Sequence, residues 1–172
     1  TGPFDKVLID YCYSLALPLR YVFVNNPLYN ETNYIYSIYL AREHLAGDIL
    51  LMHGDLVFEF KVLRDLLKQE NSGMVVSSTV PLPRKDFKAV IENGLIRKIG
   101  VEFFDHAVAA QPLYQLREED WRIWLERICF FCENQRVRSY AEDAFNEISA
   151  RCIFIRWIFK IGSVVRLTPQ RT

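Results

Sequence analysis

Asp55 is the residue whose type and position point most directly to chemistry. It follows the apolar run Ile49–Met52 at a corner formed with His53 and Gly54. A short apolar run of this kind is typical of a central parallel strand that is buried on both faces. Ligands of open α/β sheets bind outside the carboxyl ends of such strands, and Mg²⁺ prefers one or two carboxylates together with substrate phosphates. Asp55 is therefore a candidate Mg²⁺ ligand, although a Gly-Asp pair also suits a simple turn.

Asn33 and Ser37 form a second candidate pair, near the start of a helix predicted over residues 32–45. Residues four apart lie on the same face of a helix. The free backbone amides of a helix N-terminus suit an anion or a nucleotide. Capping of the helix is the competing role for both side chains.

Further polar candidates lie in the second half of the chain. Asp86 and Lys88 are two residues apart, so alternation places both on one face of a predicted strand. A solvated, charged edge strand is the alternative interpretation of this pair. Glu142 and Asn146 lie on a predicted helix, and an exposed helix face is a strong alternative interpretation for Glu142. Tyr114 could face a ligand or belong to the core.

Aromatic residues are frequent, at 14% of the chain. Tyr29, Tyr34 and Tyr36 raise the hypothesis of an aromatic cage for a quaternary ammonium group. Trp121 and Trp124 are three residues apart on one helix face, a spacing more typical of core packing.

The elements that must position these residues alternate between strands and helices, a pattern typical of a doubly wound α/β sheet. Asn93-Gly94 lies between two short apolar runs and predicts an antiparallel hairpin beside that sheet. Helices are predicted near residues 4–13, 32–45, 62–67, 118–132 and 140–148, and strands near 20–24, 49–52, 74–79, 87–91, 96–99, 111–114 and 152–161.

Bulk composition bounds the class of protein. The chain has 172 residues, enough for one domain with its own core. Its 21 basic and 21 acidic side chains balance, so no net charge attracts it to nucleic acid. No run reaches the roughly 18 apolar residues of a membrane helix, and we recognise no signal peptide. The four cysteines lack the spacing of a zinc site, so we expect free thiols and a cytoplasmic protein.

A longer motif joins the first two candidate sites. It reads Asn-Pro-x-Tyr over Asn26–Tyr29, then Thr32-Asn33 and Ser37, then a helix, and then the strand that ends in Gly54-Asp55. This arrangement resembles the nucleotidyltransferases that activate phosphocholine and related small phosphates, within the wider group of sugar-phosphate nucleotidyltransferases. The resemblance spans roughly residues 22–147. It implies a Rossmann-like, GT-A-like three-layer α/β/α fold, with a mostly parallel sheet, an inserted β-hairpin and no counterpart of the first βα elements.

The resemblance also implies a reaction, the Mg²⁺-dependent transfer of a nucleotidyl group from a nucleoside triphosphate to a small phosphate or phosphonate such as phosphocholine. CTP is the favoured donor, and a sugar 1-phosphate is the alternative acceptor. The resemblance assigns Asp55 to the metal and Lys88 to catalysis near the acceptor phosphate. It places Asn33, Ser37 and Gly54 beside the nucleotide, and Asp86, Tyr114, Glu142 and Asn146 at the acceptor.

Two features of the family have no counterpart in this chain. One is the opening strand with its Gly-rich, basic phosphate loop and the Pro-Lys segment that follows. The other is a second metal-binding carboxylate, because residues 152–172 contain neither Asp nor Glu. We therefore expect a single partial nucleotidyltransferase domain over residues 1–172, with a divergent tail at 152–172 and little or no activity in isolation. The alternative is a non-catalytic remnant that binds a partner, or a second copy of the chain, through an exposed sheet edge.

Overall fold

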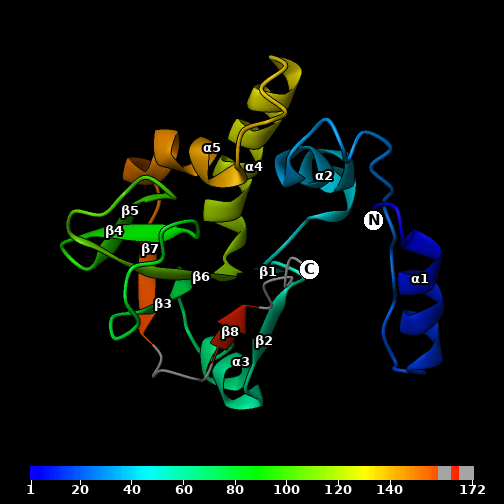
Figure 1. Ribbon diagram of the computed structural model, residues 1–172, viewed down its shortest axis with the longest axis horizontal. Helices are drawn as coiled ribbons and strands as arrows, with labels where there is room; N and C mark the ends of the chain where they lie inside the picture. The colour runs from blue at the N-terminus through cyan, green and yellow to red at the C-terminus, as the bar shows by residue number, and fades with distance from the viewer. Residues whose placement is uncertain (159–163, 167–172) are drawn as a thin grey trace.

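A six-stranded sheet in the order β1-β6-β3-β7-β5-β4 organises the computed structural model, which describes residues 1–158 and 164–166 (Figure 1). A second, two-stranded sheet joins β2 to β8. Residues 159–163 and 167–172 lie outside the described residues. They include the end of the strand predicted over residues 152–161 and most of the tail predicted after it. The strands are β1 Ile49–Met52, β2 Leu56–Phe58, β3 Ser72–Ser77, β4 Lys88–Glu92, β5 Leu95–Gly100, β6 Ala107–Leu116, β7 Phe154–Ile158 and β8 Val164–Arg166. The helices are α1 Asp5–Ser14, α2 Tyr34–Ala41, α3 Phe60–Leu66, α4 Glu118–Glu133 and α5 Ala141–Ile148, with short 3-10 turns η1 Arg42–His44 and η2 Ser149–Arg151.

The sheet is mixed in direction, and the prediction of a mostly parallel sheet is wrong because most of the described strand pairs are antiparallel. Among the described strand pairs only β3 and β7 are parallel, because the long strand β6 runs antiparallel between β1 and β3. The strands β1, β3 and β7 therefore share one direction without all being neighbours. The prediction that Ile49–Met52 is a central parallel strand buried on both faces is wrong. Within the described residues β1 pairs only with β6, so its side chains are half-buried and that of Met52 is exposed.

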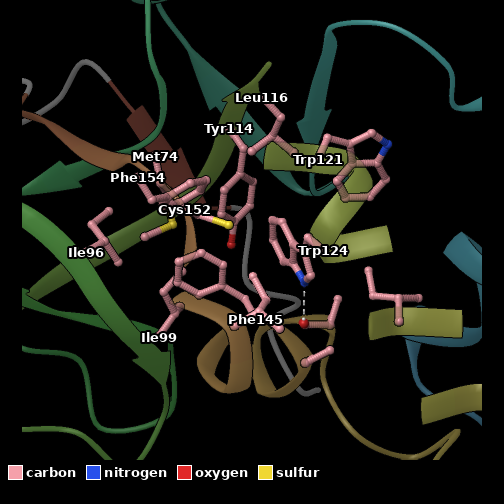
Figure 2. Close-up of a cluster of buried hydrophobic side chains, with 14 of the residues drawn as sticks. Met74, Ile96, Ile99, Tyr114, Leu116, Trp121, Trp124, Phe145, Cys152 and Phe154 are labelled. Atoms are coloured by element: carbon pink, nitrogen blue, oxygen red, sulfur yellow. Dashed lines mark hydrogen bonds between the residues drawn. The ribbon is translucent and has the colours of Figure 1, made fainter. Parts of the chain in front are cut away.

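Helices cover both faces of the sheet, which confirms the predicted three-layer α/β arrangement. Along β3, Met74 and Val76 pack with α2, α4 and α5, whereas Val75 between them packs with α3. This alternation follows from the two-residue period of a strand. Trp121 and Trp124 lie inside the larger cluster at 1% exposure each (Figure 2), so the core interpretation of this pair is confirmed.

The predicted hairpin is present. Asn93 and Gly94 take left-handed φ values of 51° and 82°, as a two-residue hairpin turn requires. The hairpin joins β4 to β5, and both strands also contact the rest of the sheet, β4 through β6 and β5 through β7. The loops at its open end are residues 81–87, before β4, and residues 101–106, after β5.

The N-terminal segment differs from its prediction. The amphipathic helix α1 forms, but its apolar side chains Phe4, Val7 and Tyr11 are exposed, and it lies apart from the sheet in Figure 1. Residues 20–24, which are predicted to be a strand, form no strand in the structure. The Thr1 nitrogen donates to the Val24 carbonyl at 2.6 Å. None of the described helices has the length and apolar character needed to cross a bilayer.

Candidate active site

Asn26 is the centre of the motif that precedes α2. Its side chain is 2% exposed, and its Nδ2 donates to Thr32 Oγ1 at 3.0 Å and to Ser37 Oγ at 3.1 Å. Its Oδ1 accepts from the backbone amide of Leu28 at 2.9 Å. One buried amide therefore fixes the loop against the first turns of α2. The sequence motif contains Asn26, but nothing in the sequence indicates that Asn26, more than its neighbours, makes the hydrogen bonds that hold the loop.

Asn33 caps α2, as the competing interpretation of this residue proposes. The side-chain Oδ1 of Asn33 accepts from the backbone amide of Tyr34 at 2.8 Å, and the backbone amide of Asn33 donates to the Val137 carbonyl at 2.8 Å. These bonds place the start of α2 against the loop that precedes α5. A role for Asn33 beside a nucleotide stays a prediction.

The His53-Gly54-Asp55 corner follows β1 directly. The His53 amide donates to the Pro112 carbonyl at 3.1 Å, and the His53 carbonyl accepts from the Leu56 amide at 3.3 Å. These bonds close a tight turn that leaves Gly54 exposed and Asp55 half-buried. The corner is thus tied to β6 on one side and leads into β2 on the other.

Two adjoining cavities meet at this corner. The larger has a volume of about 580 Å³ and lies between α2 and the end of β1, with Ser37, Gly54 and Asp55 in its lining. The smaller has a volume of about 230 Å³ and includes Asn33 and Asp86. Five of the predicted site residues therefore lie around one pair of cavities. Tyr34 and His53 line both of them.

The walls of the two cavities differ in chemistry. The larger cavity is mostly apolar, whereas the smaller one contains the charged side chains Lys85 and Asp86. Aromatic rings surround the smaller cavity, with the Phe87 and Tyr140 rings 5.0 Å apart in an edge contact. Aromatic faces beside a carboxylate suit an organic cation, and a lysine suits a phosphate. Tyr140 was not predicted, because it reaches the site only through the packing of α5.

Lys88 is not among the described residues that line either cavity. Its side chain is 0% exposed, and its ammonium donates to the carbonyls of Asp86 at 2.9 Å and Val101 at 2.6 Å. Both of these residues line the smaller cavity. Lys88 therefore joins the two loops at the open end of the hairpin, and its direct catalytic role stays a prediction.

Glu142 and Tyr114 also lie behind the cavity walls. Glu142 is 1% exposed, so the interpretation of this residue as part of an exposed helix face is wrong. Its carboxylate accepts from Tyr114 Oη at 2.6 Å and, on its other oxygen, from Tyr34 Oη. Tyr114 is fully buried in the larger hydrophobic cluster (Figure 2).

Asn146 makes a two-point contact with the sheet. Its Oδ1 accepts from the Ile99 amide at 2.8 Å, and its Nδ2 donates to the Ile99 carbonyl at 2.9 Å. The side chain thus attaches α5 to β5. The predicted contacts of Tyr114, Glu142 and Asn146 with an acceptor stay predictions.

Asp55 fits a metal that arrives with its substrate. In the described part of the chain, no group of three or more His, Cys, Asp and Glu side chains could hold a metal ion. Mg²⁺ commonly takes one or two protein carboxylates and completes its coordination with phosphate oxygens and water. Asp55, which lines the larger cavity, can supply one such carboxylate. The four cysteines are free thiols, and burial raises the pKa of Cys132 and Cys152 to about 11.

The buried ammonium of Lys88 predicts a pH dependence of stability. Burial lowers the pKa of Lys88 below its usual 10.5, although the Asp86 and Glu102 carboxylates oppose this shift. At pH values between the lowered pKa and 10.5, the unfolded chain keeps the Lys88 proton and the folded chain loses it. The contribution of Lys88 to the free energy of unfolding therefore rises with pH in this range. We expect Lys88→Met to lack that rise. Urea unfolding of both proteins across this pH range measures it, and parallel pH profiles would contradict the assignment.

Comparison with known proteins identifies the fold. The chain superposes on the inositol-1-phosphate CTP transferase of T. maritima with a TM-score of 0.74 and 15% identity, over 96% of this chain and 67% of that one. It superposes on the CTP:phosphocholine cytidylyltransferase of Streptococcus pneumoniae with a TM-score of 0.70 and 14% identity, over 94% and 68%. No protein-family model matches the chain.

One curated protein is similar in sequence. The CMP-5'-(3-aminopropyl)phosphonate synthase of Streptomyces rubellomurinus is 35% identical over 104 residues, which cover 56% of this chain. The chain spans only 17% of that protein's length. The resemblance found in the sequence motif is thereby confirmed at the level of the fold, and the chain has the α/β fold of the nucleotidyltransferases.

Proposed function

We propose that this chain is part of a nucleotidyltransferase, in which a phosphate or phosphonate oxygen of a small acceptor attacks the α-phosphorus of a nucleoside triphosphate. The new P–O bond forms as the bond to pyrophosphate breaks, and CTP is the favoured donor. The observation that carries the proposal is the pair of cavities that meet at the His53-Gly54-Asp55 corner. Two substrates held in adjoining cavities have their reacting groups close together, which lowers the entropic cost of the reaction.

The larger cavity suits the nucleotide. Its volume of about 580 Å³ lies within the usual range for small-molecule sites. The apolar face of α2 can cover a base and ribose, Ser37 offers a hydroxyl, and we place the phosphates beside Asp55. Asp55 would hold Mg²⁺ there, and the cation would offset the charge that develops on the phosphate oxygens.

The smaller cavity suits the acceptor. Lys85 and Asn33 can donate to a phosphate or phosphonate, and Asp86 and the aromatic rings can receive an amine or quaternary ammonium group. The aminopropylphosphonate and phosphocholine named for two of the similar proteins each combine these groups. A sugar 1-phosphate would present no cation to Asp86 and the aromatic walls, so we place it second.

Turnover by this chain alone is proposed to be low. Among the described residues of the larger cavity there is no Lys or Arg to offset the triphosphate charge. Stabilisation of such charge by fixed donors is usually the largest catalytic contribution. Binding should therefore be easier to detect than pyrophosphate release.

Calorimetric titration with CTP, with and without Mg²⁺, tests the proposal, with ATP and GTP as matched donors. Titration with 3-aminopropylphosphonate, phosphocholine and glucose 1-phosphate then compares acceptors. Heat from CTP that depends on Mg²⁺, and tighter binding of the two cationic acceptors, support it. The absence of heat with every donor and every acceptor would overturn it.

A binding module without catalysis is the second candidate, and the sheet edge favours it. Within the described residues β1 pairs only with β6, and Met52 on it is 44% exposed. An unpaired edge strand can accept a strand from another chain. Concentration-dependent association in sedimentation velocity, without any nucleotide heat, would select this candidate over the enzyme.

A further inference from the structure

The Tyr34 ring forms part of the wall between the two cavities. It is one of two residues that line both, the other being His53. The two rings make an edge contact, with centroids 4.8 Å apart at an interplanar angle of 66°. His53 directly precedes Gly54 and Asp55, so the orientation of the Tyr34 ring bears on the corner that carries the proposed metal ligand.

The hydroxyl of Tyr34 is held from behind the wall. It donates to the carboxylate of Glu142, which is 1% exposed on α5. The same carboxylate accepts from Tyr114 on β6 at 2.6 Å. Residues from α2, β6 and α5 therefore meet at one buried carboxylate.

We propose that Tyr34 is a positioning residue of the site, with its ring fixed by Glu142 so that the wall and the adjoining His53-Gly54-Asp55 corner are preformed. Glu142 then acts through Tyr34 and does not touch a substrate, unlike the role that the family resemblance implies. The expected effect on substrate binding rests on the proposed function, whereas the expected effect on the orientation of His53 does not. A site whose walls are already ordered loses less conformational freedom when a ligand binds.

The chain contains a matched pair of variants for this test. Tyr34→Phe and Tyr114→Phe each remove one hydroxyl donor from the same buried carboxylate. Only Tyr34 lies against His53 and lines the cavities. A general loss of stability should therefore be similar in the two variants, whereas a loss of positioning should be confined to Tyr34→Phe.

The first readout needs no ligand. The chain has three histidines, so the imidazole carbon–proton signals in an NMR spectrum are few, and His53→Gln identifies the signal of His53. We expect Tyr34→Phe and Glu142→Gln to shift that signal by more than its linewidth and Tyr114→Phe to leave it in place. An unmoved His53 signal in Tyr34→Phe, or an equal shift in Tyr114→Phe, would overturn the proposal.

The second readout connects the wall to the substrates. We expect Tyr34→Phe to weaken the binding of Mg²⁺–CTP and of 3-aminopropylphosphonate by roughly tenfold each, the effect of one well-placed hydrogen bond. Unchanged affinities for both ligands in Tyr34→Phe would contradict the positioning role. If the wild-type chain binds neither ligand, the proposed function fails, and the His53 signal still decides whether Glu142 positions Tyr34.

Discussion

Replacement of Asp55 by Asn is expected to remove the effect of Mg²⁺ on CTP binding. The amide has the same shape as the carboxylate but lacks the negative charge that a hard cation requires. No group of three metal-binding side chains is present in the described residues to replace it. Where turnover can be measured, the rate should fall roughly 10²–10³-fold, which corresponds to several kcal/mol of lost charge stabilisation. Calorimetric titration of CTP across a series of Mg²⁺ concentrations measures the first effect, and pyrophosphate release measures the second.

Asp86→Asn is the matched control for this experiment. Asp86 is also a half-buried carboxylate but lines the smaller cavity and not the larger one. It should weaken the binding of a cationic acceptor and leave the Mg²⁺ dependence of CTP binding as in the wild type. If Asp55→Asn bound CTP with the wild-type dependence on Mg²⁺ while remaining folded, Asp55 would not be the metal ligand.

Elements with local signals could be predicted from the sequence. The hairpin follows from Asn93-Gly94, because the left-handed turn is set by those two residues. The helices of the second half follow from their apolar periodicity. The position of β1 at the sheet edge could not be predicted, because strand neighbours are decided by segments distant in sequence. The same apolar run suits a central strand or a half-buried one.

The residues of the candidate site also divide into those with a local signal in the sequence and those without one. Ser37, Gly54 and Asp55 reach one cavity because they lie where a helix begins and a strand ends, positions that the motif itself specifies. Asp86 reaches the second cavity from the loop before β4. Glu142, by contrast, has a charged side chain on an amphipathic helix, a pattern typical of a solvated face. Two tyrosine hydroxyls contributed by other elements show how this carboxylate can be buried.

Lys88 shows a further limit of predictions that rest on the two-residue period of a strand. The two-residue period correctly brings Asp86 and Lys88 into one neighbourhood, but Asp86 lies in the loop before β4 and Lys88 is the first residue of the strand. The ammonium turns back to the backbone carbonyl of Asp86, and the Asp86 carboxylate is still close enough to act on the pKa of Lys88. A strand pattern gives the face on which a residue lies, and the strand boundary decides whether the pattern applies.

Gly73→Ala is expected to lower the free energy of unfolding by about 3 kcal/mol, at the upper end of the usual range for overpacking. Gly73 lies in β3 between β6 and β7. An added Cβ would overlap the carbonyl oxygen of Ile155 and the indole nitrogen of Trp157, with the indole Cδ1 only 2.9 Å away. The backbone oxygen cannot move aside without breaking the parallel pair β3–β7. For a chain of this size the midpoint of thermal unfolding should fall by about 6–12 °C.

Two other glycines separate this steric effect from the general cost of replacing glycine. A Cβ on Gly54 meets nothing within 4 Å, so Gly54→Ala should change stability by about 0.5 kcal/mol or less. Gly94 also has open space but a φ of 82°, so Gly94→Ala should cost about 1 kcal/mol through backbone strain alone. Thermal and urea unfolding of the three variants should rank them Gly73, Gly94 and Gly54, from largest loss to smallest. A Gly73→Ala protein as stable as Gly54→Ala would mean that β7 does not pack against β3 in this register, and that β7, with the Phe154 side chain it brings to the core, is placed differently.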